Sequence, residues 1–471
     1  MTQKSLRTEL SKTYKLALPI IISQLGVILM GTSDNVIVGR LLGPVSLGAA
    51  GIANSVAFLI GSLAVGGMAV IAPMVSKLRA ERDTSEQLSA LFFNSLMAAL
   101  LYGTFLSLVG YIVYRQFSIL GQTPAIESLG APFFILIILS NIPMIFFLAV
   151  KQFTDGFSKP AIVMYITLLG LLFDIAGNVV LIRGLWIFPE LGLNGAAIGT
   201  IFSRLLMLGI LLFYIRNQPA FRVLFHFSRW KADRSILSVI LKRSIPAGFQ
   251  AFFEIAAFSF AVIMMGWLSE TELAAHQIAI NVASTTYMMA TGFAHAGSIR
   301  IGEAWGKRDS TGIRLSGRAA YTWVIGFMGL CSLVILLFGQ WIIKIYIDDS
   351  AVLAAALPLL MIAAFFQLSD GAQSVGLGLL RGLADIRVPT YITFVAYWLI
   401  ALPAGYVLGF AFHLGSVGIW FGLLLGLTFS ALFLYARYNR VSRRPLSPEV
   451  IPGTAQSPGS PPPVSPPASA G

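Results

Sequence analysis

Charged side chains are scarce in this sequence. Asp, Glu, Lys and Arg make up 11% of its 471 residues, whereas a soluble domain of this length would usually be about a quarter charged. So few charges cannot cover a water-facing surface, while 57% of the residues are hydrophobic and the mean hydropathy is +0.82. The deficit excludes an ordinary soluble protein and predicts that lipid covers the outer surface.

Motifs of enzymes and of ATP-driven pumps are also missing. No Walker motif occurs, so ATP is not expected to drive this chain directly. A paired-aspartate metal motif of a membrane transferase is absent as well. The single cysteine, Cys331, excludes an intramolecular disulfide. We therefore expect no enzymatic activity, no cofactor and no structural metal.

Long apolar runs are what the sequence has in abundance. Each run holds about 20 residues or more, enough for a helix to cross roughly 30 Å of hydrocarbon. Twelve runs can be counted, at residues 15–39, 46–73, 88–114, 130–150, 160–184, 192–216, 240–266, 273–297, 318–345, 353–380, 388–411 and 415–438. Because they do not alternate as the strands of a membrane barrel do, they predict an all-α membrane protein with twelve transmembrane helices.

The basic residues that give the net charge of +12 are concentrated on one side of the expected membrane topology. With residues 1–14 in the cytoplasm, the inside segments hold 27 of the 32 Lys and Arg residues. The positive-inside rule predicts this split, with both termini cytoplasmic and a multi-pass protein in the inner or plasma membrane. The basic balance therefore gives no reason to expect a nucleic-acid partner.

The chain also repeats itself at an offset of 226. Residues 47–56 read LGAAGIANSV and residues 273–282 read LAAHQIAINV, with five identities. The same offset aligns Arg82-Asp83 with Arg308-Asp309. Six spans separate equivalent points, so the halves form a parallel repeat of two six-helix lobes. Two such lobes can enclose a cleft that opens to either side in turn, as a transporter needs.

The repeat divides the chain into five parts. They are a cytoplasmic N-terminus at 1–14, an N-lobe at 15–216, a cytoplasmic linker at 217–239, a C-lobe at 240–438 and a tail at 439–471. Nine of the 22 prolines lie in residues 445–471, so we expect the tail to be disordered and cytoplasmic.

Four acidic residues lie well inside predicted spans: Asp34, Asp174, Glu254 and Asp370. An ionised carboxylate at the centre of such a helix costs about 3 kcal/mol on insertion scales. Carboxylates persist there when they face a cavity, pair with a cation or bind a proton. Each of these roles suits a site for a coupling ion or for a cationic substrate.

Other polar residues are expected to lie near the N-lobe acids. Asp174 and Asn178 are four residues apart and share one helix face, and Thr200 of the next span adds a hydroxyl. Oxygen ligands of this kind suit Na⁺, and the carboxylates alone suit a proton. In the alternative interpretation, Asp34 and Asp174 form a static ion pair with Arg204, one turn beyond Thr200, unless Arg204 reaches a polar neighbour elsewhere.

The C-lobe acids do not repeat those of the N-lobe. At the offset of 226, Glu254 and Asp370 align with Ile28 and Met144. This divergence favours a division of labour, in which one lobe couples the ion and the other recognises the organic cation. In the alternative interpretation, each carboxylate makes only a hydrogen bond that packs the helices.

Several segments together resemble the multidrug and toxic compound extrusion (MATE) transporters, closest to the NorM-like branch. They are GTSDNVIVGRLLGPVSLGAAGIANSV (31–56), FDIAGNVVLIRG (173–184), GAAIGT (195–200), ELAAHQIAINV (272–282) and IGEAWGKRD (301–309). The resemblance covers about residues 10–440. It implies twelve helices in two lobes, and antiport of Na⁺ or H⁺ against cationic, often amphipathic drugs.

The resemblance also assigns roles to residues. Asp34 matches the first-span acid of the family, and Asp174, Asn178 and Thr200 match polar positions of its N-lobe ion site. Glu254 and Asp370 match acids described for the C-lobe of the NorM-like branch. The family commonly has Asn where Asp174 stands, so the resemblance implies an extra negative charge in this N-lobe. Some members have Tyr where Phe366 stands, and Phe366 offers no oxygen, which weakens the case for Na⁺ in the C-lobe.

The sequence therefore predicts a multidrug exporter that works by alternating access, in the lipid bilayer and as a monomer. One alternative is a lipid-linked precursor flippase, although a pyrophosphate cargo should need more cationic residues than Arg204 inside the spans. Another is a membrane receptor or scaffold that uses the proline-rich tail as its partner motif.

Overall fold

The structure is a computed structural model that describes residues 5–81, 85–121, 123–226, 230–347 and 349–445. These residues are almost entirely helical, and no strand occurs among them. The prediction of an all-α membrane protein is confirmed. The last helix, α13 (Gly415–Val441), runs slightly past the expected start of the tail, and residues 446–471 lie outside the described residues.

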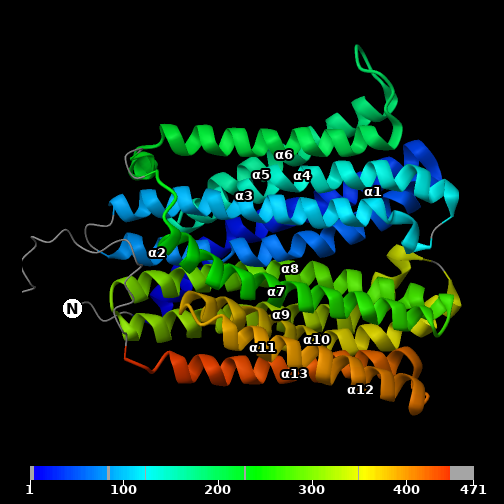
Figure 1. Cartoon of the computed structure of the whole chain (residues 1–471). Helices are drawn as coiled ribbons and strands as arrows, with labels where there is room; N and C mark the ends of the chain where they lie inside the picture. The colour runs from blue at the N-terminus through cyan, green and yellow to red at the C-terminus, as the bar shows by residue number, and fades with distance from the viewer. Residues whose placement is uncertain (1–4, 82–84, 122, 227–229, 348, 446–471) are drawn as a thin grey trace, which may run out of the picture.

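Six stretches of helix make up the N-terminal half of the chain (Figure 1). They are α1 (Leu6–Met68), α2 (Ile71–Ala80), α3 (Ser85–Arg115), α4 (Pro124–Gly156), α5 (Ala161–Arg183) and α6 (Gly192–Asn217). A short 3₁₀ helix (Phe117–Leu120) precedes α4, and another (Pro219–Phe225) follows α6.

The C-terminal half contains seven α-helices. They are α7 (Arg234–Gly266), α8 (Glu270–Gly306), α9 (Ser310–Tyr346), α10 (Ser350–Gly382), α11 (Arg387–Phe394), α12 (Leu402–Tyr406) and α13. Several begin with a Ser or Asp side chain that accepts a hydrogen bond from a backbone N–H of the first turn, which stabilises the helix start. These capping residues are Asp233, Ser269, Asp309 and Asp349.

The helices add up to twelve membrane spans in the described part of the chain. Ten stretches are long and apolar enough to cross a membrane. The stretch Leu6–Ala80 counts twice, because the chain turns at Gly43, whose positive φ of 83° favours glycine, and Pro44 follows. Helix α8, with 37 residues, is more polar and is not among these ten, and it brings the total to twelve. The predicted number of spans is therefore confirmed.

The eleventh span is irregular. Between α11 and α12 the chain forms a π-helical segment (Val395–Ala401), and a second one (Val407–Ala411) follows α12. Pro403 has no N–H to donate to the carbonyl of Leu399, so the regular hydrogen bonding of an α-helix is interrupted in this region. Such π-helical turns often occur at functional sites, and this one includes Tyr397, which is fully buried.

The two halves form two lobes that lie side by side (Figure 1), with blue to green helices on one side and green to red helices on the other. Helices α1 and α2 of the N-lobe pack against α7 and α8 of the C-lobe. The start of α1 and the C-terminal end of α13 lie at the same end of the bundle. We call this the termini end.

The lobes approach each other closely near the termini end. A Cβ atom added to Gly66 would lie 2.4 Å from the carbonyl oxygen of Ala247, and one added to Gly306 would lie 2.2 Å from that of Lys77. A larger side chain at either position would force the helices apart, which is how small residues permit close packing inside membranes. The lobe interface is therefore closed at this end.

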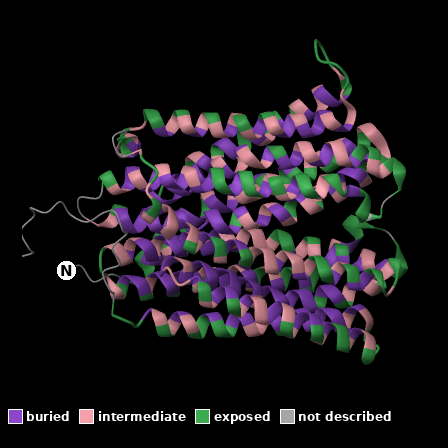
Figure 2. Cartoon of the chain, viewed as in Figure 1, coloured by how far each residue is buried: buried purple, intermediate pink, exposed green. Residues whose placement is uncertain are grey.

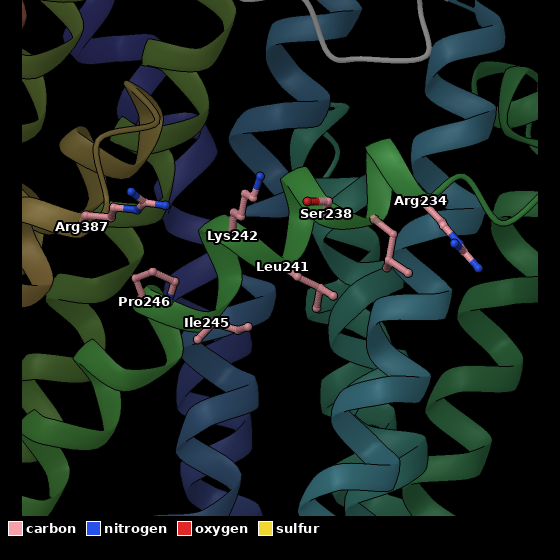
Figure 3. A pocket seen from close by; sticks show the side chains of 8 residues that line it. Arg234, Ser238, Leu241, Lys242, Ile245, Pro246 and Arg387 are labelled. Atoms are coloured by element: carbon pink, nitrogen blue, oxygen red, sulfur yellow. The ribbon is translucent and has the colours of Figure 1, made fainter.

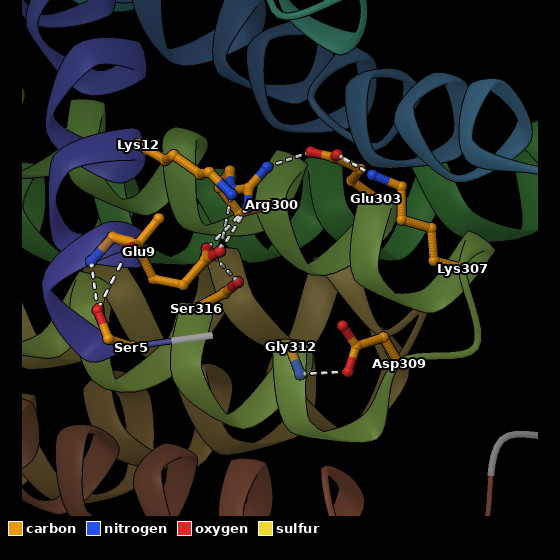
Figure 4. A network of polar contacts seen from close by, with 10 residues as sticks. Ser5, Glu9, Lys12, Arg300, Glu303, Lys307, Asp309, Gly312 and Ser316 are labelled. Atoms are coloured by element: carbon orange, nitrogen blue, oxygen red, sulfur yellow. Dashed lines mark hydrogen bonds and ion pairs between the residues drawn. The ribbon is translucent and has the colours of Figure 1, made fainter. Parts of the chain in front are cut away.

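A polar network, drawn in Figure 4, joins the lobes at the same place. Arg300 of α8 donates to Glu9 of α1 over 2.7 Å and 3.0 Å, and it also contacts Glu303. Ser316 of α9 donates to Glu9 over 3.3 Å, and only 1% of Glu9 is exposed. A buried carboxylate held by a guanidinium of the other lobe ties the start of α1 to the C-lobe.

The outward faces of the helices are apolar. Figure 2 shows exposed residues along the sides of the bundle and buried ones between the helices. Large exposed side chains on these faces include Phe105, Leu108, Phe213, Leu337 and Leu432. A surface of this kind is stable only in hydrocarbon, as the low charge content predicted.

Candidate functional site

The N-lobe brings together the polar residues that the sequence singled out. Asp34 lies in the first span, in α1, while Asp174 and Asn178 lie one turn apart on α5. The Nδ2 atom of Asn178 donates to Asp34 Oδ1 over 2.6 Å and lies 3.3 Å from Asp174 Oδ2. One amide thus joins two carboxylates from different helices.

Two oxygen atoms of this cluster lack a donor. Asp174 and Asn178 are fully buried, and neither Asp174 Oδ1 nor Asn178 Oδ1 has a hydrogen-bond partner among the described residues. Buried acceptors without partners are costly. Because a cation or a proton would satisfy them, the arrangement suits a binding site more than a static packing contact.

Helix α6 closes the cluster from the other side. Gly199 lies so close that a Cβ there would be 2.2 Å from Asn178 Oδ1. The neighbouring Thr200 is buried beside Asp174, and its hydroxyl donates to the carbonyl of Ala196 over 3.2 Å. A hydroxyl that donates to its own helix keeps lone pairs for a cation. We call Asp34, Asp174, Asn178 and Thr200 the N-lobe cluster.

Arg204, on the same helix, points to different partners. Its Nη1 atom donates to Ser140 Oγ over 2.7 Å and to Asn141 Oδ1 over 2.9 Å, both on α4. No ion pair joins Arg204 to Asp34 or Asp174 within the described chain, although the charges interact at longer range. The two carboxylates thus keep oxygen atoms that the guanidinium does not occupy.

A second polar cluster lies in the C-lobe. Glu254 of α7 accepts from Gln373 Nε2 over 3.3 Å, and the same nitrogen lies 2.8 Å from the Tyr397 hydroxyl. Asp370 lies one turn before Gln373 on α10, close enough to interact with the charge of Glu254. Glu254, Asp370, Gln373 and Tyr397, all at least nine-tenths buried, form the C-lobe cluster.

Sequence reasoning missed half of this second cluster. Gln373 and Tyr397 carry no charge, so nothing distinguished them from other polar residues within spans. Tyr397 supplies a phenol oxygen from the π-helical turn, whereas Phe366 packs against Trp420 with 5.8 Å between ring centroids. Arg381, placed by sequence just beyond a span, is near enough to interact with Glu254. The C-lobe cluster therefore has more polar groups than expected.

Each cluster is built from its own half of the chain. The structure brings Asp34 to Asp174, and Glu254 to Asp370. No hydrogen bond or ion pair between described residues joins the two pairs. The described residues contain no group of three His, Cys, Asp or Glu side chains with the arrangement of a metal site. Mixed carboxylate, amide and hydroxyl oxygens instead suit Na⁺ or a proton in the N-lobe cluster.

Comparisons with known proteins agree with this architecture. The family model described as MatE matches residues 19–180 and 246–407, one segment in each lobe. A probable multidrug resistance protein NorM of Rhizobium meliloti is 33% identical over 435 residues, covering 91% of this chain and 93% of the relative. The corresponding protein of Pseudomonas putida is 31% identical over 433 residues, covering 91% and 93%.

Solved structures share the fold. A eukaryotic MATE transporter superimposes with a TM-score of 0.84 at 18% identity, covering 93% of this chain and 98% of that one. A multidrug resistance MATE transporter in an outward-facing conformation gives the same TM-score and identity, covering 93% and 97%. The two-lobed arrangement of twelve helices is thus one already seen in solved transporters.

Proposed function

Because this chain belongs to the MATE family of multidrug efflux transporters, we propose that it exports organic cations in exchange for Na⁺ or H⁺. The observation that carries this proposal is the N-lobe cluster. Two carboxylates share a single amide N–H₂, and two buried acceptor oxygens have no donor. A coupling ion would supply the missing positive charge.

The amide of Asn178 makes the cluster adjustable. In the present arrangement its NH₂ group lies between the carboxylates and partly compensates their charge. An arriving cation takes that place, and rotation of the amide then presents Oδ1 as a further ligand. Ion binding therefore rearranges the contact between α1 and α5 without moving either backbone far.

Ion coupling requires different affinities in the two conformations. An ion that bound both equally would shift neither population. We propose that the ion binds the N-lobe cluster in the outward-facing state and that the drug binds near the C-lobe cluster in the inward-facing state. The lobes then rock about the interface of α1 and α2 with α7 and α8, in a monomer whose termini are cytoplasmic.

The test is efflux of ethidium by everted membrane vesicles that contain the protein. A Na⁺ gradient and a pH gradient are imposed separately, and ethidium fluorescence is followed. We expect one gradient to drive transport and an ionophore that collapses it to stop transport. If neither gradient drives transport of ethidium or other organic cations, the proposed antiport is wrong.

Glu254 is expected to control recognition of the cation. Glu254→Gln removes a buried negative charge while keeping the acceptor for Gln373, so the half-saturating ethidium concentration should rise by about tenfold or more. Asp385→Asn is the matched control, since Asp385 pairs with Arg437 away from the cluster over 2.7 Å. Unchanged half-saturation in Glu254→Gln would show that the C-lobe cluster only packs helices.

A further inference from the structure

A hollow of about 460 Å³ lies at the start of α7, where α11 also begins. Figure 3 shows Arg387 of α11 extending toward Lys242 of α7, while Arg234 marks the opposite edge. Arg234 and Lys242 are eight residues apart, a little more than two turns along α7. Three cationic side chains from two helices therefore line one open hollow.

These cations are not paired with any acid in the part of the chain that the structure describes. Arg234, Lys242 and Arg387 are exposed, and none has an ion-pair partner among the described residues. Like charges around one hollow repel each other. The positive-inside rule accounts for basic residues in this hydrophilic segment, but it does not require three of them to line one hollow. The site is thus electrostatically incomplete and matches an anion.

The acidic residues next to these cations in the sequence are engaged elsewhere. Asp233 caps α7, where its Oδ1 accepts the backbone N–H of Ser235 over 2.8 Å. Hydrogen bonds from Ser235 hold the pKa of Asp233 below its ordinary value, so it stays charged in this capping role. Asp385, two residues before Arg387, pairs with Arg437 over 2.7 Å. Neither acid is free to neutralise the hollow.

Below the cations the hollow is apolar. Leu241, Ile245 and Pro246 line it, and Ile245 is 47% exposed. The apolar surface continues one turn further along both helices, through Phe249 of α7 and Tyr391 of α11, which are also exposed. Cations above an apolar track match a ligand with an anionic head and hydrocarbon chains.

Pro246 explains why the helices leave a hollow here. Proline has no N–H to donate to the carbonyl of Lys242, so the helix is weakened at this turn. The carbonyl of Pro246 accepts the Thr390 hydroxyl over 2.9 Å, which fixes α11 against α7. The hollow is therefore a defined feature of the α7–α11 junction.

We propose that this basic hollow binds an anionic phospholipid, with its phosphate between Arg234, Lys242 and Arg387 and an acyl chain along Ile245 and Phe249. Basic pockets between transmembrane helices at a membrane surface are suited to such head groups. The lipid supplies the missing negative charge and covers apolar surface at the same time, which a free anion cannot do.

The site occurs once in each chain. At the repeat offset of 226, Thr8, Leu16 and Ala161 stand where Arg234, Lys242 and Arg387 stand in the C-lobe. The N-lobe therefore lacks all three cations at its equivalent junction. One lipid bound per chain is expected.

The experiment measures lipid binding to the purified, delipidated full chain in detergent. Thermal unfolding is followed while dioleoyl phosphatidylglycerol, dioleoyl phosphatidylcholine or glycerol 3-phosphate is added. We expect phosphatidylglycerol to raise the midpoint temperature saturably, since a ligand that binds only the folded state stabilises it. Phosphatidylcholine and glycerol 3-phosphate should have much smaller effects.

Matched variants separate a site from general surface charge. Replacing Arg234, Lys242 and Arg387 together by Ser should weaken phosphatidylglycerol binding by roughly a hundredfold. Replacing Arg314, Arg318 and Arg440 by Ser removes the same charge from exposed positions on α9 and α13, and should leave binding almost unchanged.

Three outcomes would overturn the proposal. They are equal loss of binding in both triple variants, retained binding in the first one, and an equal effect of glycerol 3-phosphate alone. Native mass spectrometry checks the first triple variant if its unfolding temperature is already altered, because it counts bound lipids directly. Drug transport does not enter the measurement, so its result is independent of the proposed antiport.

Discussion

Asp34→Asn is expected to lower gradient-driven efflux of ethidium by at least about tenfold. The substitution keeps the size of the side chain but removes one of the two carboxylates that share the Asn178 amide, the one with the shorter bond of 2.6 Å. Without this charge the N-lobe cluster binds a cation or proton more weakly, and the gradient no longer distinguishes the two conformations. Initial efflux rates from everted vesicles provide the measurement.

The control for Asp34→Asn is Glu190→Gln. Glu190 is an exposed acid in the loop between α5 and α6, outside the cluster, so its loss changes the net charge equally and should not affect efflux. Counterflow of ethidium without an ion gradient separates coupling from folding, because a folded but uncoupled variant should still exchange its substrate. Full gradient-driven efflux by Asp34→Asn would refute an ion site at this cluster.

Asp174→Asn should have a milder effect than Asp34→Asn. Asn at this position keeps one acceptor oxygen, and Asp34 remains as the carboxylate of the cluster. In the wild type, the carboxylate of Asp174 instead allows the cluster to bind a second positive charge. We therefore expect Asp174→Asn to make efflux depend less steeply on ion concentration, while the maximal efflux rate changes little.

The sequence was sufficient to predict the number of transmembrane helices and the face of α5 that carries part of the N-lobe cluster. Apolar runs report membrane spans because every span must match the thickness of the hydrocarbon. The four-residue spacing of Asp174 and Asn178 requires a shared helix face. The Nδ2 atom of Asn178 does lie 3.3 Å from Asp174 Oδ2 and 2.6 Å from Asp34 Oδ1. These inferences depend on local geometry, which the chain determines residue by residue.

Contacts between helices were harder to predict. Nothing in the sequence around Arg204 indicates that Ser140 and Asn141 lie opposite it, because that depends on how α4 packs against α6. Tyr397 reaches Gln373 from a π-helical segment, where the angular positions of side chains differ from those of an α-helix. Both misses involve uncharged partners whose roles arise only from tertiary packing.

The sequence also did not reveal the ion pair that joins the lobes. Glu9 and Arg300 are separated by 291 residues, and each belongs to a hydrophilic segment that the positive-inside rule treats as a topology signal. The contact shows that some of these charges have a second use, which is to hold the closed interface at the termini end.

Arg300→Gln is therefore expected to open the termini end of the lobe interface. Among the described side chains, Glu9 would keep only Ser316 and the half-exposed Lys12, which lies 3.4 Å away. Removing one partner of a buried ion pair costs up to about 3–5 kcal/mol. A change of about 5.5 kcal/mol shifts a two-state equilibrium from 1:99 to 99:1. Loss of a contact of this size is therefore enough to shift the balance between closed and open lobes strongly toward the open state.

Maleimide labelling of Ser76→Cys, in a Cys331→Ser background, measures this opening. Ser76 is 3% exposed and faces Gly302 across the lobe interface, so labelling of nanodisc-embedded protein requires separation of the lobes. Arg300→Gln should raise the labelling rate by about tenfold or more, whereas Arg318→Gln, which removes an exposed charge of α9, should not. A wild-type labelling rate in Arg300→Gln would show that the ion pair does not hold the interface.

The double variant Glu9→Gln, Arg300→Gln separates the lost contact from the unpaired charge. When both partners become neutral, no uncompensated carboxylate remains in the interface, and paired amides can still hydrogen-bond. Labelling should then be slower than in Arg300→Gln alone, because the closed state no longer holds a buried carboxylate at position 9. Faster labelling in the double variant would mean that attraction across the interface, more than the cost of an isolated charge, keeps the lobes together.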